Sequence, residues 1–262
     1  ENGCIEYKAI KAGEHKGIII NFKNDYHSGS LVLDLVVDNL WYRESNLIEF
    51  YDSKRYTNGS RGWPSSNRKV SGGFINNSVA QKPSLIKRFV GNNTNVLYFD
   101  GVDDVLKNKT NSYLQSIKSG VIFFKPEMDN NTYAQLIGNY ELGVHLAIDN
   151  RNGNKNGFSF DGSSNSSFKN KGLVVDLSDG FSKGSYKENS NDVVWKNNEW
   201  NKMYFEFDNS VTFTDEMHLG ALEINGGDYY FFKGYIMFVS FFKEDLKEEE
   251  INDILTWANN KH

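Results

Sequence analysis

The run from Val96 to Leu106 (VLYFDGVDDVL) constrains the fold of this chain most, because it joins two apolar segments through a tight Asp100-Gly101 turn. Alternating apolar runs that meet at Asp-Gly are a strong signal for a β-hairpin or a corner between strands. The chain has 23 Gly, only 3 Pro and 15% aromatic residues, which favours many short strands separated by glycine turns. We therefore expect an all-β protein.

Further strand-like runs follow this corner at fairly regular spacing, separated by Gly- and Asn-rich turns. They are Val121–Phe124, Ala134–Ile137, Leu142–Asp149, Gly157–Asp161, Leu173–Leu177, Trp200–Asp208, Met217–Ile224 and Tyr235–Phe242. Before the corner, Gly17–Phe22 is typical of a buried strand, and Leu31–Val37 alternates like a strand, although a helix there stays open. The pattern predicts an antiparallel two-sheet β-sandwich or jelly roll.

The C-terminal segment has a different periodicity. Ile251, Ile254, Leu255 and Ala258 are spaced as on one face of a helix, and the acidic residues at 248–250 suit its first turn. Asp245 is the predicted N-cap. The sequence thus predicts one short α-helix after the last strand.

Length and charge limit the organisation and the partners. A chain of 262 residues is long for one domain, but sandwiches of this size occur, so we expect a single domain over residues 1–262. The net charge of −5 without a basic cluster argues against nucleic acid. Apolar runs fall far short of the about 20 residues that span a bilayer, so no membrane insertion is expected. Cys4 is the only cysteine, which excludes an intrachain disulfide.

Several motifs resemble a known superfamily. These are Phe99-Asp-Gly-Val-Asp-Asp104 preceded by Gln81–Leu85, Gly220-Ala221, and the closing strand Tyr235–Phe242 followed by Leu246 and the helix. Together they resemble the laminin-G-like domains of the concanavalin A-like lectin/glucanase superfamily, which are common in phage tail and bacterial surface proteins. The resemblance covers residues 81–262, whereas residues 1–80 match only loosely. It implies a concanavalin A-like jelly roll, but function must be argued from the site.

Catalysis would need paired acids. Retaining glucanases of the resembling superfamily use a Glu-X-Asp-X-(X)-Glu strand, and the nearest candidate here is Glu206-Phe-Asp208. Ser210 and Val211 stand where a second Glu would fall. A second acidic group, Asp215, Glu216, His218 and Glu223, could be imagined as a metal site or general base, but a turn followed by a half-exposed strand is the favoured interpretation. We therefore expect no catalytic residues, with Glu206 and Asp208 as the alternative.

Calcium is considered because lectins of the resembling fold use loop oxygens. The loop Asp149–Gly157 spaces Asn150, Asn152, Asn154 and Asn156 like calcium ligands, but these ligands are neutral and no terminal Glu follows. Asp100, Asp103 and Asp104 carry more charge, yet the resemblance implies that they form the corner. No metal site is predicted, and calcium remains an open alternative.

Sugar binding needs an aromatic ring beside hydrogen-bonding side chains on a shallow surface. The sequence offers such residues in three places: the long polar stretch 51–84, the 149–157 turn, and the segment with Asn197 and Asn198. The candidate ligand-binding residues are Tyr56, Arg61, Trp63, Asn150, Arg151, Asn152 and Trp195. For Trp63 and Trp195, core packing and ligand stacking are equally compatible with the sequence.

These observations favour a non-catalytic carbohydrate- or receptor-binding module of a phage tail, virion or bacterial surface protein. Its expected partner is a cell-surface glycan or host receptor, its expected location extracellular, and its weak single-site affinity would be raised in a homo-oligomer. A polysaccharide hydrolase or lyase, which needs a cleft with paired acids, is one alternative. A structural or decorating virion module, with a large apolar patch and no pocket, is the other.

Overall fold

The computed structural model describes residues 13–23, 28–37, 47–52, 63–64, 73–75, 81–89, 94–108, 116–129, 132–139, 144–151, 157–162, 172–176, 195–211, 217–224 and 227–261. It groups the chain into two compact units, Glu1–Arg43 and Glu44–His262. The sequence favoured one domain over 1–262, because single β-sandwich domains of similar length occur. Whether both units fold as one domain stays a prediction.

The first unit contains an antiparallel hairpin of β1 (Gly13–Lys23) and β2 (Ser28–Val37). Ile18 pairs with Leu33 and Ile20 pairs with Leu31 in its register. The segment Leu31–Val37, for which the sequence left strand and helix open, is therefore strand.

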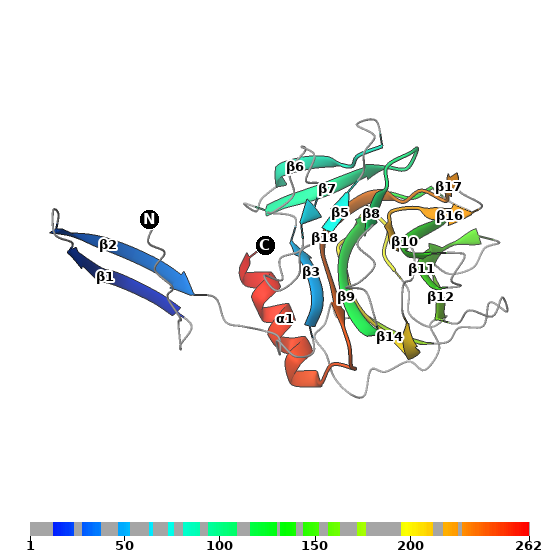
Figure 1. Cartoon of the computed structure of the whole chain (residues 1–262). Helices are drawn as coiled ribbons and strands as arrows, with labels where there is room; N and C mark the ends of the chain where they lie inside the picture. Colours follow the sequence, from blue (N-terminus) through cyan, green and yellow to red (C-terminus); the bar gives the residue numbers. More distant parts are fainter. Residues whose placement is uncertain are drawn as a thin grey trace. The chain divides into compact units, whose positions relative to one another are not determined.

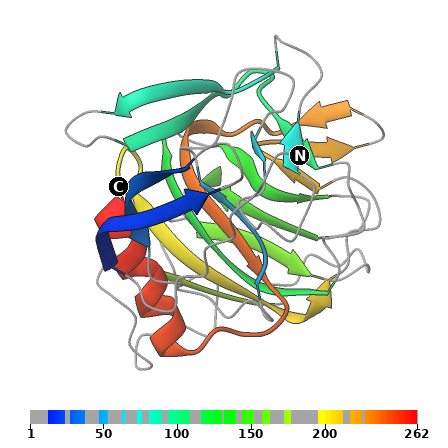
Figure 2. The same cartoon turned by 60° about the vertical axis from the view of Figure 1, so that its left-hand side comes forward.

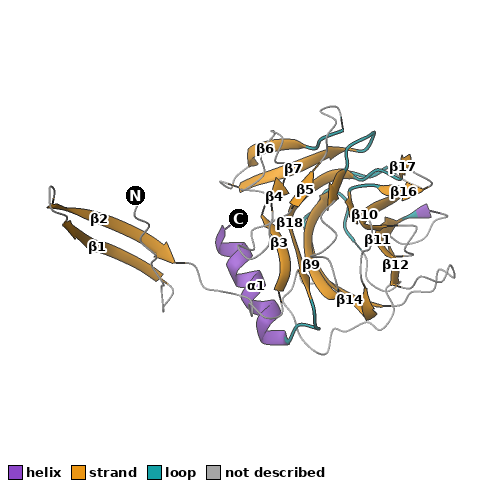
Figure 3. Cartoon of the chain, viewed as in Figure 1, coloured by secondary structure: helices purple, strands orange, loops and turns teal. Residues whose placement is uncertain are grey.

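The second unit consists of two large antiparallel sheets with one helix (Figures 1 and 3). Sheet I has the order β12-β11-β10-β15-β8-β5-β4, and sheet II has the order β13-β14-β9-β18-β7-β6, with β3 also paired to β18. Sheet I comprises β4 (Trp63–Pro64), β5 (Gly73–Ile75), β8 (Leu106–Asn108), β10 (Tyr133–Asn139), β11 (Val144–Asp149), β12 (Gly157–Gly162) and β15 (Met217–Leu219). Sheet II comprises β3 (Leu47–Asp52), β6 (Ser84–Phe89), β7 (Thr94–Asp100), β9 (Ile117–Pro126), β13 (Gly172–Asp176), β14 (Asn201–Val211) and β18 (Lys233–Phe242).

One hydrophobic core lies between the two sheets. Alternation along the strands directs Leu106, Ile137 and Leu219 from sheet I and Ile122, Phe205 from sheet II into it. This arrangement confirms the predicted all-β, two-sheet sandwich.

The other face of sheet II is covered by helix α1 (Glu248–Lys261), which Figure 2 shows in red beside the sheet. Ile251 and Ile254 are fully buried, and the Trp257 ring lies 5.3 Å from the ring of Phe238 on β18. Because β9 and β18 are covered on both faces, most of their residues are buried, rather than every second one. The predicted C-terminal helix is present.

The N-cap of α1 differs from the prediction. The carbonyl of Lys247 accepts the first helical hydrogen bond from Ile251, so Lys247 occupies the cap position. Its own N–H donates to the Glu250 carboxylate at 2.9 Å, as in half of a capping box. Asp245 lies two residues earlier, where its side chain pairs with Lys118 Nζ at 3.7 Å.

The Asp100-Gly101 turn is a corner and not a hairpin, because β7 belongs to sheet II and β8 to sheet I. Gly101 has φ +80°, a conformation that costs a glycine little. The Asp100 carboxylate accepts the N–H of Val102 at 2.7 Å, and the Asp104 carboxylate accepts the N–H of Asp100 at 2.7 Å. The two acids therefore close the corner themselves.

The predicted strand Met217–Ile224 is divided. Gly220, with φ +89°, separates β15 from β16 (Leu222–Ile224), which pairs instead with β17 (Gly227–Tyr229) in a short antiparallel hairpin. In Figure 1 this hairpin lies near β10 and β11, away from α1. In the described part of the chain, no helix is long and apolar enough to cross a membrane.

Candidate functional site

Three tyrosines and an arginine lie where β10, β11 and the end of β17 meet. Tyr133 starts β10, Arg151 follows the end of β11, Tyr229 ends β17, and Tyr230 comes next. We call these four residues the tyrosine-arginine patch. Backbone bonds hold the three strands together here, since β10 pairs with β11 and the N–H of Gln135 donates to the carbonyl of Tyr230 at 2.9 Å.

Arg151 is held by two neighbours. Its Nε and Nη2 atoms donate to the two oxygens of Asp149 at 3.0 and 2.9 Å, a bidentate pair of the stronger kind. Burial alone would raise the pKa of the Asp149 carboxyl, but the hydrogen bonds from Arg151 lower it below its ordinary value. The guanidinium carbon lies 4.4 Å from the centre of the Tyr133 ring, which is cation-π geometry. The arginine is thus fixed and yet partly exposed.

Part of the hydrogen-bonding capacity of Arg151 remains available. A guanidinium has five N–H donors, and two of them are used on Asp149. The other three have no hydrogen-bond acceptor among the described residues, and 45% of the Arg151 side chain is exposed. Because Asp149 balances the positive charge, this part of the patch offers directed donors with little net charge.

The two adjacent tyrosines supply aromatic surface. Tyr229 is 51% exposed and Tyr230 46%. The Tyr230 ring meets the Tyr133 ring edge to face, with centres 5.2 Å apart. Tyr230 has φ +53°, which is uncommon for a residue other than glycine and turns its side chain out of the strand alternation.

The loops beneath the patch are ordered by Asn150. Its Oδ1 accepts the N–H of Thr132 at 2.5 Å, and its Nδ2 donates to the carbonyl of Asp129 at 3.2 Å. Its own N–H donates to the carbonyl of Thr132 at 3.0 Å. Asn150, a predicted ligand-binding residue, therefore joins the start of β10 to the end of β11, and its amide is used within the protein.

Of the other predicted ligand-binding residues, Arg151 joins the patch and Trp195 does not. Trp195 is 1% exposed and belongs to the core, so its ring offers no face to a sugar. Its neighbour Asn197 is also structural, since it exchanges two hydrogen bonds with the backbone of Met128 at 2.9 and 2.8 Å. Trp63 pairs with Phe74 in the register of β4 and β5. The side chain of Trp63, and Tyr56, Arg61 and Asn152 as a whole, lie outside the described residues.

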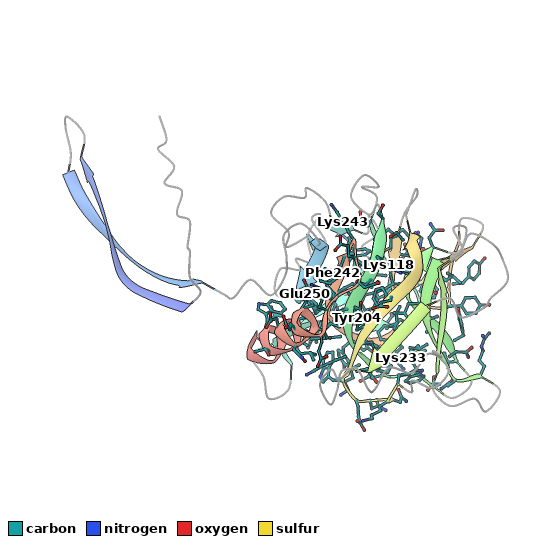
Figure 4. The ribbon with its side chains drawn as sticks, turned by 90° about the horizontal axis from the view of Figure 1, so that it is seen from below. Lys118, Tyr204, Lys233, Phe242, Lys243 and Glu250 are labelled. Carbon is teal, nitrogen blue, oxygen red and sulfur yellow. The ribbon has the colours of Figure 1, made fainter. Side chains whose placement is uncertain are left out.

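The alternative catalytic pair, Glu206 and Asp208, lies on β14. The Glu206 carboxylate accepts the hydroxyl of Tyr204 at 2.6 Å, and that hydroxyl accepts the N–H of Leu246 at 2.9 Å. Burial raises the pKa of the Glu206 carboxyl. Figure 4 shows Tyr204 and Lys118 on neighbouring strands near α1. Glu206 therefore helps to seat the segment that leads into the helix.

Whether Glu206 and Asp208 share a face is not settled by simple alternation. The register of β14 against β9 shifts between Glu206 and Val211, which interrupts the two-residue period on which the prediction depended. The side chain of Asp208 lies outside the described residues. The absence of catalytic residues stays a prediction, with this pair as the alternative.

In both calcium candidates, acidic side chains bond to groups of the protein itself. Asp149 pairs with Gly157 across β11 and β12 and binds Arg151, whereas Asn152, Asn154 and Asn156 of this candidate lie outside the described residues. Oxygens of Asp100, Asp103 and Asp104 all lie within 4.8 Å of one another. Burial, followed by repulsion from Asp100 and Asp103, raises the pKa of Asp104 to about 6. The bonds of Asp100 and Asp104 to the backbone of the corner account for the closeness of these acids.

His218 is more buried than predicted. The sequence favoured a half-exposed strand there, but His218 is 0% exposed on β15. Its Nδ1 lies 3.4 Å from Asp228 Oδ1, and Asp228 Oδ2 lies 3.0 Å from Lys107 Nζ. The hairpin β16–β17, which carries Asp228, covers this part of sheet I.

The sequence interpretation did not single out Tyr133, Tyr229 or Tyr230. A signal was present in Gly226-Gly-Asp-Tyr-Tyr230, since neighbouring strand residues point to opposite faces and two consecutive aromatics cannot both enter one core. The sequence did not indicate which of the two tyrosines would be exposed. In the structure both are exposed.

No protein-family model matches the chain, and no curated protein matches it. Among solved structures, it is similar to domain 4 of AbnA, a GH43 extracellular arabinanase from Geobacillus stearothermophilus, in complex with arabinotriose. The TM-score is 0.48 at 11% identity, over 81% of this chain and 99% of that one. At this identity the likeness concerns the fold alone. Membership of the laminin-G-like family stays a prediction.

Proposed function

We propose that this chain is a carbohydrate-binding module and that the tyrosine-arginine patch is its binding surface. The observation that carries the proposal is the exposure of Tyr229 and Tyr230, together with the contact of the Tyr230 ring with Tyr133, the ring over which the fixed guanidinium of Arg151 lies. Aromatic rings cover the apolar faces of pyranose and furanose rings, while the guanidinium donates to hydroxyl oxygens. An exposed aromatic cluster has a cost in solubility, so a binding role accounts for it better than chance.

The patch suits a neutral glycan better than a charged one. Asp149 neutralises Arg151 through its bidentate pair, and the protein as a whole carries a net charge of −5. An anionic polysaccharide would therefore gain little attraction and would meet overall repulsion. Binding carried by stacking and neutral hydrogen bonds should depend weakly on salt.

The setting that we propose is a phage tail, virion or bacterial surface protein outside the cell. There the target would be a cell-surface glycan or receptor, and several copies would bind together. Exposed patches of this size bind weakly one at a time, and multivalent display raises the effective affinity without any new contact.

A panel of immobilised neutral and anionic polysaccharides, including arabinan, tests the proposal with the variants Tyr229→Ala and Tyr230→Asn. Asparagine is chosen because it tolerates the positive φ of this position. Each variant should weaken binding about tenfold, which corresponds to about 1.4 kcal/mol.

Tyr98→Ala is the matched control. Tyr98 is a half-buried tyrosine on β7 whose ring lies 5.0 Å from Tyr235, so its loss removes an aromatic ring elsewhere. The control should bind like the parent. Equal losses in all three variants would contradict the patch, and a folded parent that binds no member of the panel would contradict glycan binding and favour a protein-contacting module.

A further inference from the structure

The hairpin that carries the exposed tyrosines is too short to hold its own position. Strands β16 and β17 share only three residue pairs, Leu222 with Tyr229, Glu223 with Asp228, and Ile224 with Gly227. A two-stranded hairpin is marginally stable at best in water, even when it is longer. Its position on sheet I must therefore come from contacts outside the hairpin.

Asp228, the middle residue of β17, supplies such a contact. Its two carboxylate oxygens are divided between two partners, Oδ2 lying 3.0 Å from Lys107 Nζ and Oδ1 lying 3.4 Å from His218 Nδ1. Lys107 on β8 and His218 on β15 stand directly opposite each other in the register of sheet I. One carboxylate thus bridges two neighbouring strands of the sheet.

Strand alternation links this bridge to the patch. Successive residues of a strand point to opposite faces, so the direction of Asp228 toward sheet I sends Gly227 and Tyr229 the other way. The Tyr229 ring then lies back over Gly227, where an added Cβ would come within 3.0 Å of it. The carbonyl of Tyr230 accepts the N–H of Gln135 at 2.9 Å and fixes the other end of the segment.

The surroundings strengthen the bridge. His218 is fully buried, and the side chains of Asp228 and Lys107 are 11% and 22% exposed, so water screens the pair only in part. Burial alone would raise the pKa of the Asp228 carboxyl, but the neighbouring His218 imidazole and Lys107 ammonium lower it below its ordinary value. The carboxylate is therefore in its charged form at neutral pH.

We propose that Asp228 is a positioning residue for glycan binding, because it fastens β17 to Lys107 and His218 and thereby holds Tyr229 and Tyr230 in place at the tyrosine-arginine patch. This inference rests on the proposed function, since it assumes that the two rings meet a ligand. Asp228 itself faces the sheet and does not touch the glycan.

The test combines amide hydrogen exchange without ligand and glycan affinity. In Asp228→Ala, amides of β16 and β17 should exchange at least tenfold faster than in the parent, while those of β9 stay protected. Affinity for the glycan that binds the parent best should fall at least tenfold. Asp253→Asn, which removes an exposed acid from α1, is the control for the loss of one negative charge.

Two further variants keep the test decisive if Asp228→Ala does not fold. Lys107→Met removes one partner and should give the same faster exchange with a smaller loss of affinity. A double variant of Lys107→Met with Tyr229→Ala should bind no worse than Tyr229→Ala alone, because the bridge acts through the ring.

The outcomes separate the two proposals. A parent that binds no glycan refutes the proposed function, while the exchange rates still report whether Asp228 fastens β17. A parent that binds glycan, together with Asp228 and Lys107 variants of unchanged exchange and unchanged affinity, refutes the positioning role. Faster exchange with unchanged affinity also refutes it.

Discussion

The two outer faces of the sandwich are covered in different ways. On sheet II, α1 packs Ile251, Ile254 and Trp257 against the strands, and its cover is apolar. On sheet I, the hairpin β16–β17 is fastened through the carboxylate of Asp228, which pairs with Lys107 and lies 3.4 Å from His218 Nδ1. Apolar burial contributes stability without fixing directions, whereas an ion pair fixes a direction and contributes less. One cover therefore stabilises the fold, and the other places exposed rings.

The largest expected effect is a loss of stability when apolar contact between α1 and sheet II is removed. Ile254→Ala should lower the free energy of unfolding by about 3 kcal/mol, because it leaves a cavity at a fully buried position. Urea denaturation followed by tryptophan fluorescence measures this loss. Glycan affinity of the folded variant should stay within twofold of the parent, and a tenfold loss would show that the two covers are coupled.

A smaller loss of stability is expected at Tyr204, whose hydroxyl holds the segment that leads into α1. Tyr204→Phe should cost about 2 kcal/mol, because the buried Leu246 N–H loses its acceptor and Glu206 loses its donor. Urea denaturation of this variant beside Tyr98→Phe, a half-buried tyrosine, isolates the hydroxyl. Equal costs in the two variants would mean that the Tyr204 hydroxyl does not seat the helix.

The corner between the sheets should show a pH dependence. The folded pKa of Asp104, about 6, lies above its ordinary value of 3.8, so its contribution is fully present below pH 3.8 and is lost as the pH rises through about 6. Asp104→Asn should therefore stabilise the protein at pH 7 by about 1 kcal/mol, since solvent screens part of the linkage energy. At pH 4 the gain should nearly vanish in thermal unfolding, and an equal gain at both pH values would contradict the raised pKa.

Adding calcium tests whether the three acids at this corner bind a metal. If Asp100, Asp103 and Asp104 only close the corner, 5 mM CaCl₂ should leave the Tm of the parent unchanged. A rise in Tm that Asp103→Asn abolishes would instead establish a metal site there.

The smallest effect is expected within the hairpin. Gly227→Ala should displace the Tyr229 ring by a few tenths of an ångström, because the new Cβ would lie 3.0 Å from it. The free energy of unfolding should change by less than about 0.5 kcal/mol, while glycan affinity falls about threefold. An affinity equal to that of the parent would show that the exact place of this ring does not matter.

Much of the fold was predictable because it depends on local patterns. Alternation located the strands, the 251–258 spacing located α1, and Asp100-Gly101 located the corner. The division of the Met217–Ile224 run was missed. It depends on the positive φ of Gly220, and the sequence does not show which of the 23 glycines adopt a positive φ. The true N-cap was missed for a similar reason, since Lys247 acts through its backbone and not through a capping side chain.

The candidate site was less predictable because it depends on which faces meet. Arg151 was anticipated, but the rings beside it come from Tyr133 and Tyr230, which are about a hundred residues apart in sequence. Trp195 was a binding candidate because of its polar neighbours, with core packing as the equal alternative. Its ring is buried in the core, and the Asn197 side chain bonds to the backbone of Met128. Tyr56, Arg61 and Asn152 stay predictions.

The place of β18 in sheet II has a consequence for synthesis of the chain. This strand pairs with β9 on one side and with β7 and β3 on the other, yet it follows all three in sequence. As the nascent chain leaves the ribosome, β7 and β9 therefore present unpaired edges until residues 233–242 emerge. Such edges invite association with other chains. A chaperone that binds extended segments would protect this protein most during that interval.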